Sequence, residues 1–208
     1  MVDFFLRIKP IPLFVLLACL SFGPAFNLQR EYKGEDNPDM FSYLQMAEGD
    51  YETSPIRRYR WIIPTICGGL SAPITYLKPD LQQPAIRFSF FIVNWLLMAF
   101  SCTVLFGFLK SLKITAHFAF LATILILLSR WSIYFSTIPI VDSLYFFCII
   151  AFCYGIVAHK KYWIWLSILI GPMAKESFFL FLPLLYFAHS YKWSQKGLMT
   201  IVSIALFF

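Results

Sequence analysis

Apolar runs take up most of this 208-residue sequence, and they constrain its fold more than any other feature. Hydrophobic residues make up 60% of the chain and charged residues 13%, a composition that excludes a soluble core. A helix needs roughly 20 apolar residues to cross a bilayer. Runs that approach this length are residues 11–26, 88–109, 114–128, 141–158, 162–173, 178–189 and 197–208. We therefore predict an all-α, polytopic helical membrane protein with about six to seven hydrophobic helices.

Basic residues between the runs predict the orientation, because Lys and Arg near span ends are retained on the cytoplasmic side. With a cytoplasmic N-terminus, the basic turns at residues 110–113, 159–161 and 192–196 all fall inside. The same alternation of sides along the chain puts residues 27–87 on the outer face. We expect an integral protein of the plasma (inner) membrane. Residues 7–26 also resemble a signal peptide, so cleavage after this run remains an alternative.

The rest of the composition excludes some classes of function. The net charge of +6 is divided between short turns and one mixed-sign loop, so no basic face for nucleic acid is expected. The cysteines and histidines show neither a disulfide framework nor metal-ligand spacing. No cofactor follows from the sequence, and a divalent metal ion remains open. Residues 1–208 are treated as one membrane domain, which ends within an apolar run and is therefore expected to be incomplete at its C-terminus.

The predicted outer loop, residues 27–87, holds most of the acidic residues. Within it, Asn37-Pro38-Asp39 is typical of a helix start, with Asn as the N-cap and Pro in the first turn. Apolar residues then follow at the spacing of one helical face: Met40, Tyr43, Leu44 and Ala47. We expect a short helix that ends at Gly49 and lies on the outer membrane surface. Asp39 is a candidate reactive carboxylate, or it only complements the helix dipole.

Basic residues in the second half of the same loop suggest an anion site. Arg57, Arg58 and Arg60 in the outer loop favour a bound phosphate, because guanidinium groups hold phosphate through paired donors. Salt bridges to nearby acids are the alternative; those acids are Glu48, Asp50 and Glu52.

Two further charged sites lie beside apolar runs, where an unpartnered charge costs several kcal/mol. Lys175-Glu176 follows the helix-breaking pair Gly171-Pro172, and Asp142 opens the run at 141–158. Each site is a functional candidate. The alternatives are a solvated turn for Lys175-Glu176, a helix N-terminal charge for Asp142, or a charge pair between Lys175 and Asp142.

Together these motifs resemble the GT-C class of integral-membrane glycosyltransferases, in the group with protein O-mannosyltransferases and aminoarabinose transferases. The matching patterns are Asp39-x-x-x-Tyr43-x-x-x-Ala47, Tyr59-Arg60-x-x-x-Pro64, and the turn at residues 171–177 with Pro183 after it. The chain departs from the pattern at its acidic motif, where Glu35-Asp36 and Asp39 are separated rather than adjacent.

The resemblance implies transfer of a sugar from a polyprenyl-phosphate donor to an unidentified acceptor at the outer face. It implies Asp39 as the catalytic base, with Asp36 and Glu35 as reserves. It also implies that Lys175 and one of Arg58 or Arg60 stabilise the leaving phosphate. The implied substrate-binding set is completed by the remaining candidates, Glu176, Tyr43 and Asp142.

Membrane lipids and the lipid-linked donor are the expected partners. Non-enzymatic alternatives are a flippase or polymerase component for lipid-linked saccharides, a transporter, or an inactive scaffold. A transporter should carry polar residues along several spans. This chain offers mainly Asn94 and His117 there.

Overall fold

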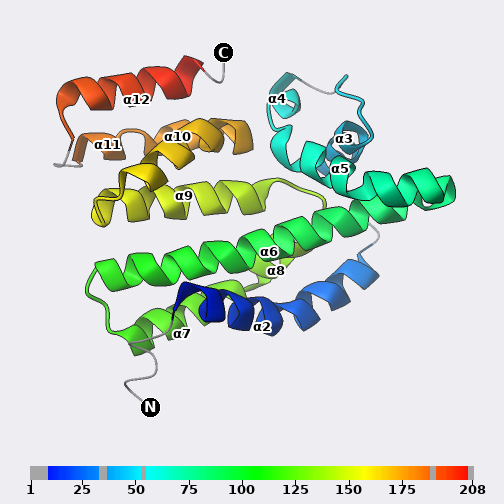
Figure 1. Ribbon diagram of the computed structural model, residues 1–208, viewed down its shortest axis with the longest axis horizontal. Coiled ribbons are helices and arrows are strands. Elements are labelled where there is room, and N and C mark those ends of the chain that lie inside the picture. Colours follow the sequence, from blue (N-terminus) through cyan, green and yellow to red (C-terminus); the bar gives the residue numbers. More distant parts are fainter. Residues whose placement is uncertain (1–8, 33–36, 53–54, 188–190, 206–208) are drawn as a thin grey trace.

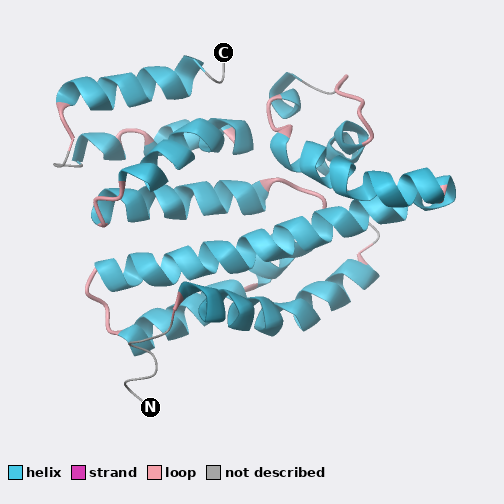
Figure 2. Ribbon diagram, viewed as in Figure 1, coloured by secondary structure: helices cyan, strands magenta, loops and turns pink. Residues whose placement is uncertain are grey.

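A computed structural model describes residues 9–32, 37–52, 55–187 and 191–205. All the regular structure in these ranges is helical, which confirms the predicted all-α class (Figure 2). Figure 1 shows most of the helices running across the molecule in stacked layers, with a smaller group of helices at one end.

The longest helix, α6 (Gln82–Ser111), forms the centre of the fold. At 1.5 Å per residue its 30 residues extend about 45 Å. On one side α6 packs against α2 (Pro10–Glu31), α7 (Ala116–Leu127) and α8 (Arg130–Thr137). On the other side it packs against α9 (Asp142–Val157), which in turn contacts α10 (Lys161–Ala174).

The remaining elements are short and complete the two ends of the fold. Between α2 and α6 in the chain come α3 (Pro38–Ala47), α4 (Pro55–Arg58), α5 (Ile62–Leu77) and the 3-10 turn η1 (Pro79–Leu81). After α10 come the 3-10 helix η2 (Glu176–Phe181), α11 (Leu184–Phe187) and α12 (Trp193–Ala205).

The prediction of six to seven membrane helices is wrong by the criterion of helix length. Within the described residues, two helical segments are long and apolar enough to cross a membrane, α2 and η1–α6, or three if α7 and α8 form one span bent by 56°. At 16 residues, α9 extends only about 24 Å, less than the roughly 30 Å hydrocarbon core. The run at 178–189 is divided between η2 and α11, because Pro183 cannot continue a hydrogen-bonded helix.

A buried amide fixes the turn between α8 and α9. Asn94 of α6 is fully buried, and its Nδ2 donates to the carbonyls of Ile138 at 3.0 Å and Ile140 at 2.9 Å. Its Oδ1 accepts from the hydroxyl of Ser143, in the first turn of α9. The Ile138 carbonyl also accepts from the backbone N–H of Ile140 at 2.8 Å, and the Asn94 amide adds a second donor there and a donor for the Ile140 carbonyl in an apolar interior. These bonds also hold in place the start of α9, where Asp142 lies.

Two glycines permit close contacts that position the charged segments. A Cβ on Gly68 of α5 would lie 2.3 Å from the carbonyl oxygen of Ala47, at the end of α3. A Cβ on Gly171 of α10 would lie 2.6 Å from the ring of Phe178. Because both separations are far below van der Waals contact, only glycine allows α5 to meet α3 and η2 to fold back on α10.

Candidate functional site

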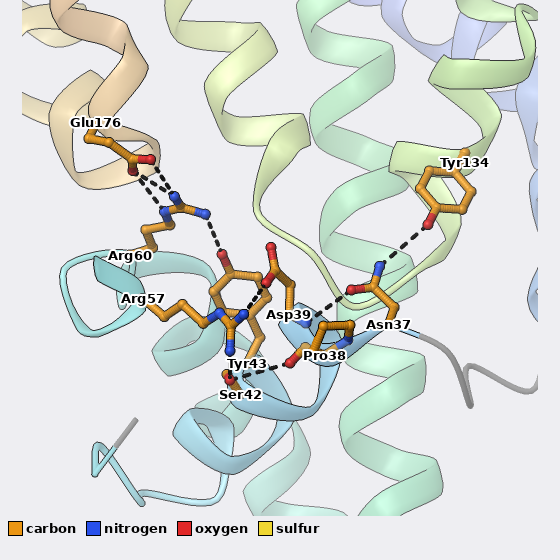
Figure 3. A network of polar contacts seen from close by, with 9 residues as sticks. All are labelled: Asn37, Pro38, Asp39, Ser42, Tyr43, Arg57, Arg60, Tyr134 and Glu176. Atoms are coloured by element: carbon orange, nitrogen blue, oxygen red, sulfur yellow. Dashed lines mark hydrogen bonds and ion pairs between the residues drawn. The ribbon is translucent and has the colours of Figure 1, made fainter. Parts of the chain in front are cut away.

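The candidate site lies where α3 and α4 approach the first residue of α9 and the junction between α10 and η2. Its first component is the start of α3. The Asn37 side chain accepts from the backbone N–H of Asp39 at 3.0 Å, which confirms the predicted N-cap with Pro38 in the first turn. Asn37 also donates to the hydroxyl of Tyr134 in α8 at 3.4 Å, which ties this helix start to the main body (Figure 3).

The apolar face of α3 is buried inside the protein. Met40, Tyr43 and Leu44 are each less than 5% exposed, and they belong to the main apolar core. The expectation that this face lies on the membrane surface is therefore wrong, because α5 and α6 cover it. The predicted helix itself is present and ends before Gly49, whose φ of +95° suits glycine.

Asp39 forms an ion pair with Arg57. The distance from Asp39 Oδ1 to Arg57 Nη2 is 2.6 Å, and Arg57 Nη1 donates to the hydroxyl of Ser42 at 2.9 Å. The Asp39 side chain remains 43% exposed. Asp39 is thus an oriented carboxylate that a hydroxyl group from solvent can still reach.

Arg60 makes the most extensive contacts in the site. Its Nη2 donates to both carboxylate oxygens of Glu176, at 2.7 and 2.6 Å, and its Nε donates to Oε2 at 3.2 Å. Its Nη1 donates to the Tyr43 hydroxyl at 2.9 Å. The Arg60 side chain is only 8% exposed. Arg60 therefore joins α3, the segment after α4 and η2 in one network (Figure 3).

The electrostatics of this network favour its charged form. Partial burial of Glu176 opposes ionisation, but the bonds from its own backbone N–H and from Arg60, with the charge of Lys175, leave its pKa lowered. Burial likewise opposes the charge of Arg60, and its contacts with Tyr43 and Glu176 outweigh that effect, so its pKa is raised. Tyr43 is the exception: burial raises its pKa, the charge and hydrogen bond of Arg60 oppose that effect without outweighing it, and the negative charges of Asp39 and Asp142 add to it.

Lys175 lies between α10 and η2 in an extended conformation, with φ of −164° and ψ of 133°. Its Nζ is 2.7 Å from Asp142 Oδ1 and 5.6 Å from the centre of the Tyr145 ring. The side chains of Lys175 and Glu176 bind different partners, because α10 ends at Ala174 and Lys175 is extended before η2 begins at Glu176. Asp142 occupies the first turn of α9 and also pairs with Lys175, so it has both of the structural roles considered for it.

The outcome for the other candidates is mixed. Arg58 is exposed and forms no ion pair with any described residue. Arg57 pairs with Asp39 and Arg60 with Glu176, and neither pairs with the acids considered as alternative partners. One of those acids, Glu48, accepts a hydrogen bond from Gln83 instead. Two sequence candidates, Glu35 and Asp36, lie outside the described residues.

An apolar groove adjoins the charged cluster. It is an open groove with a volume of about 480 Å³, lined by side chains from α2, α5, α6, α9 and α10. These side chains are Phe14, Ile62, Ile63, Ile66, Val93, Leu96, Leu97, Phe100, Leu144 and Ile170. Its lining begins at Ile62, two residues after Arg60, and includes Leu144, two residues after Asp142. The sequence patterns did not reveal this groove, because each helix contributes only a few of its residues.

No group of three or more His, Cys, Asp or Glu side chains is placed to hold a metal ion within the part of the chain that the structure describes. The charged cluster itself consists of carboxylates and cations. These groups can accept a proton, at Asp39, and stabilise negative charge, at Lys175 and the arginines.

Comparison with protein-family models, with curated proteins and with solved structures found no match for this chain.

Proposed function

We propose that this protein transfers a sugar from a polyprenyl-phosphate donor to a hydroxyl group of an acceptor at the membrane surface. The observation that carries the proposal is the position of a half-exposed carboxylate, Asp39, among cationic side chains beside an apolar groove. A lipid-linked sugar needs these elements together: a base for the acceptor, positive charge for the phosphate and an apolar surface for the chain.

Asp39 is the proposed general base. Its carboxylate takes the proton of the acceptor hydroxyl while that oxygen bonds to the anomeric carbon of the sugar. The bond from this carbon to the phosphate oxygen breaks, and the electron pair leaves with the lipid phosphate. Arg57, whose Nη2 lies 2.6 Å from Asp39 Oδ1, orients the carboxylate.

Lys175 is the proposed phosphate ligand. Both Lys175 and Arg60 have carboxylate partners, so a phosphate must compete for either of them. The Lys175 side chain is 31% exposed, whereas that of Arg60 is 8% exposed and its guanidinium binds two partners. Lys175 can therefore exchange Asp142 for a phosphate at lower cost, while Arg60 holds Tyr43 and Glu176 in position. Exposed Arg58 can supply a second positive charge.

The apolar groove is the proposed site for the prenyl chain. Its lining side chains are all hydrophobic, and they include Ile62, two residues after Arg60, and Leu144, two residues after Asp142. This lining also argues against the transporter alternative, because a path for a polar solute requires polar groups to replace its hydration.

Substitution of Asp39 tests the proposal. Membranes containing the protein are supplied with a radiolabelled polyprenyl-phosphate sugar, and transfer of label to any acceptor is measured. We expect Asp39→Asn to lower the rate by about two to four orders of magnitude, the usual scale for a lost base. Asp50→Asn, an exposed carboxylate in the same loop, is the matched control and should retain the parent rate. Near-normal transfer by Asp39→Asn would refute the assigned role.

A further inference from the structure

A second cavity, separate from the charged cluster, lies between the two helices of membrane-spanning length. Its volume is about 810 Å³. One wall comes from the last turns of α2 and the other from the first turns of α6. The lining residues are Phe26, Gln29 and Arg30 on α2, with Gln83, Pro84, Arg87 and Phe88 on α6. In Figure 1 these two helix ends lie on the same side of the molecule.

Helical periodicity explains why both walls have the same character. Phe26 and Arg30 are four residues apart, and so are Gln83 and Arg87, so each pair lies on one helix face. Phe88 follows Arg87 and adds a second aromatic ring to the lining. Each wall therefore combines an arginine with an aromatic ring at the end of a helix long enough to cross a membrane.

Both arginines lack an ionic partner in the described part of the chain. Neither Arg30 nor Arg87 takes part in the salt bridges of this structure, in contrast to Arg57 and Arg60. Among the described residues, one carboxylate bonds to a lining residue: Glu48 accepts from Gln83. Two positive charges facing one cavity raise the local potential and favour entry of an anion.

The apolar part of the cavity selects among anions. Phe26 is 40% exposed and Phe88 48% exposed, an unfavourable arrangement in water that contact with an acyl chain would relieve. Guanidinium groups bind phosphate through paired hydrogen bonds. The volume lies within the range of small-molecule sites, about 300–1,000 Å³, and exceeds what a bare phosphate needs.

We propose that this cavity binds the phosphate headgroup of a membrane lipid, held by Arg30 and Arg87, with its chains against Phe26 and Phe88. The site is independent of the proposed sugar transfer, because none of its lining residues belongs to the charged cluster. An anionic lipid here would bridge α2 and α6 at the membrane surface.

The test measures binding to the purified full-length protein in an uncharged detergent. The probes are a short-chain phosphatidic acid, the matching diacylglycerol without phosphate, and inorganic phosphate. We expect the phosphatidic acid to bind, and Arg30→Gln and Arg87→Gln each to weaken its binding by about tenfold or more, the scale of a charge-assisted contact. Arg130→Gln removes the same charge from an exposed arginine outside the cavity and should leave binding unchanged.

Each result decides one question. Equal binding of inorganic phosphate and phosphatidic acid would retain an anion site but refute the lipid as its source. Binding of diacylglycerol as tightly as phosphatidic acid would overturn the role of the arginines. Equal losses in the Arg30, Arg87 and Arg130 variants would indicate diffuse attraction and would also overturn the proposal. Because binding is read without catalysis, failure of the sugar-transfer proposal would not affect the result.

Discussion

Removal of the Arg60 side chain should destabilise the protein more than removal of any exposed arginine. Arg60→Ala deletes the bonds to both oxygens of Glu176 and the bond to the Tyr43 hydroxyl. Tyr43 is 1% exposed, so its hydroxyl loses its donor in a place that water does not readily reach, at a cost of about 1–3 kcal/mol. The Glu176 side chain is 38% exposed, so water can partly replace the arginine there.

These contributions set the expected magnitude. A fully buried ion pair that loses one partner costs about 3–5 kcal/mol, and the exposure of Glu176 places this pair at or below the lower end of that range. We therefore expect Arg60→Ala to lower the free energy of unfolding by about 3 kcal/mol. Arg58→Ala, an exposed neighbour without an ionic partner in the described chain, should change it by less than about 0.5 kcal/mol.

The assay is reversible unfolding in mixed micelles, with a double-mutant cycle between Arg60→Ala and Glu176→Gln. Contact between the two side chains predicts that the second substitution costs less once the first is present. A loss below about 1 kcal/mol for Arg60→Ala, or additive effects in the cycle, would refute the reasoning that this pair holds the segment after α4 against η2.

Three further predictions follow from the same contacts. Because the pKa of Glu176 is lowered in the folded protein, its carboxylate stabilises the fold above the pKa that Glu176 has in the unfolded chain. This stabilisation is lost as pH falls through the folded-state pKa. The free energy of unfolding measured against pH should show this loss on the acid side, and Glu176→Gln should reduce it. Lys175→Gln should weaken binding of farnesyl phosphate but not of farnesol. If farnesyl phosphate affinity is unchanged while a double-mutant cycle on unfolding shows strong coupling between Lys175 and Asp142, Lys175 is a structural residue only. Gly171→Ala should lower the unfolding free energy by about 1–3 kcal/mol through its clash with Phe178, while Gly69→Ala, with open space around it, should not; equal effects would contradict the packing argument.

The network around Arg60 marks the limit of what local sequence patterns could predict. The start of α3 was predictable, because Asn37, Pro38 and Asp39 are adjacent and the cap depends on backbone geometry within a few residues. The partner of Arg60 was not, because Glu176 is 116 positions away and three acids nearer in the sequence were equally plausible. Tyr43 entered the candidate set only through the family resemblance, yet its hydroxyl binds Arg60 directly.

The number of membrane helices shows a related limit. Apolar composition correctly indicated helices, but run length alone overstated how many are long enough to cross a bilayer. Whether an apolar run becomes one long helix depends on breaks such as Pro183 and the extended backbone at Lys175. An apolar face also does not reveal what covers it: the α3 face contacts α5 and α6, where lipid was expected.

The all-helical class, the start and end of α3, and the accumulation of charge in the region before α6 follow from the amino-acid sequence alone, because helix propensity, capping and hydrophobicity act over a few neighbouring residues. Which charges pair depends instead on how the helices pack. Asp39 with Arg57, Arg60 with Glu176 and Asp142 with Lys175 depend on packing that brings separate helix ends together. The apolar groove and the two-arginine cavity have the same origin, since each is formed between helices and exists in none of them alone.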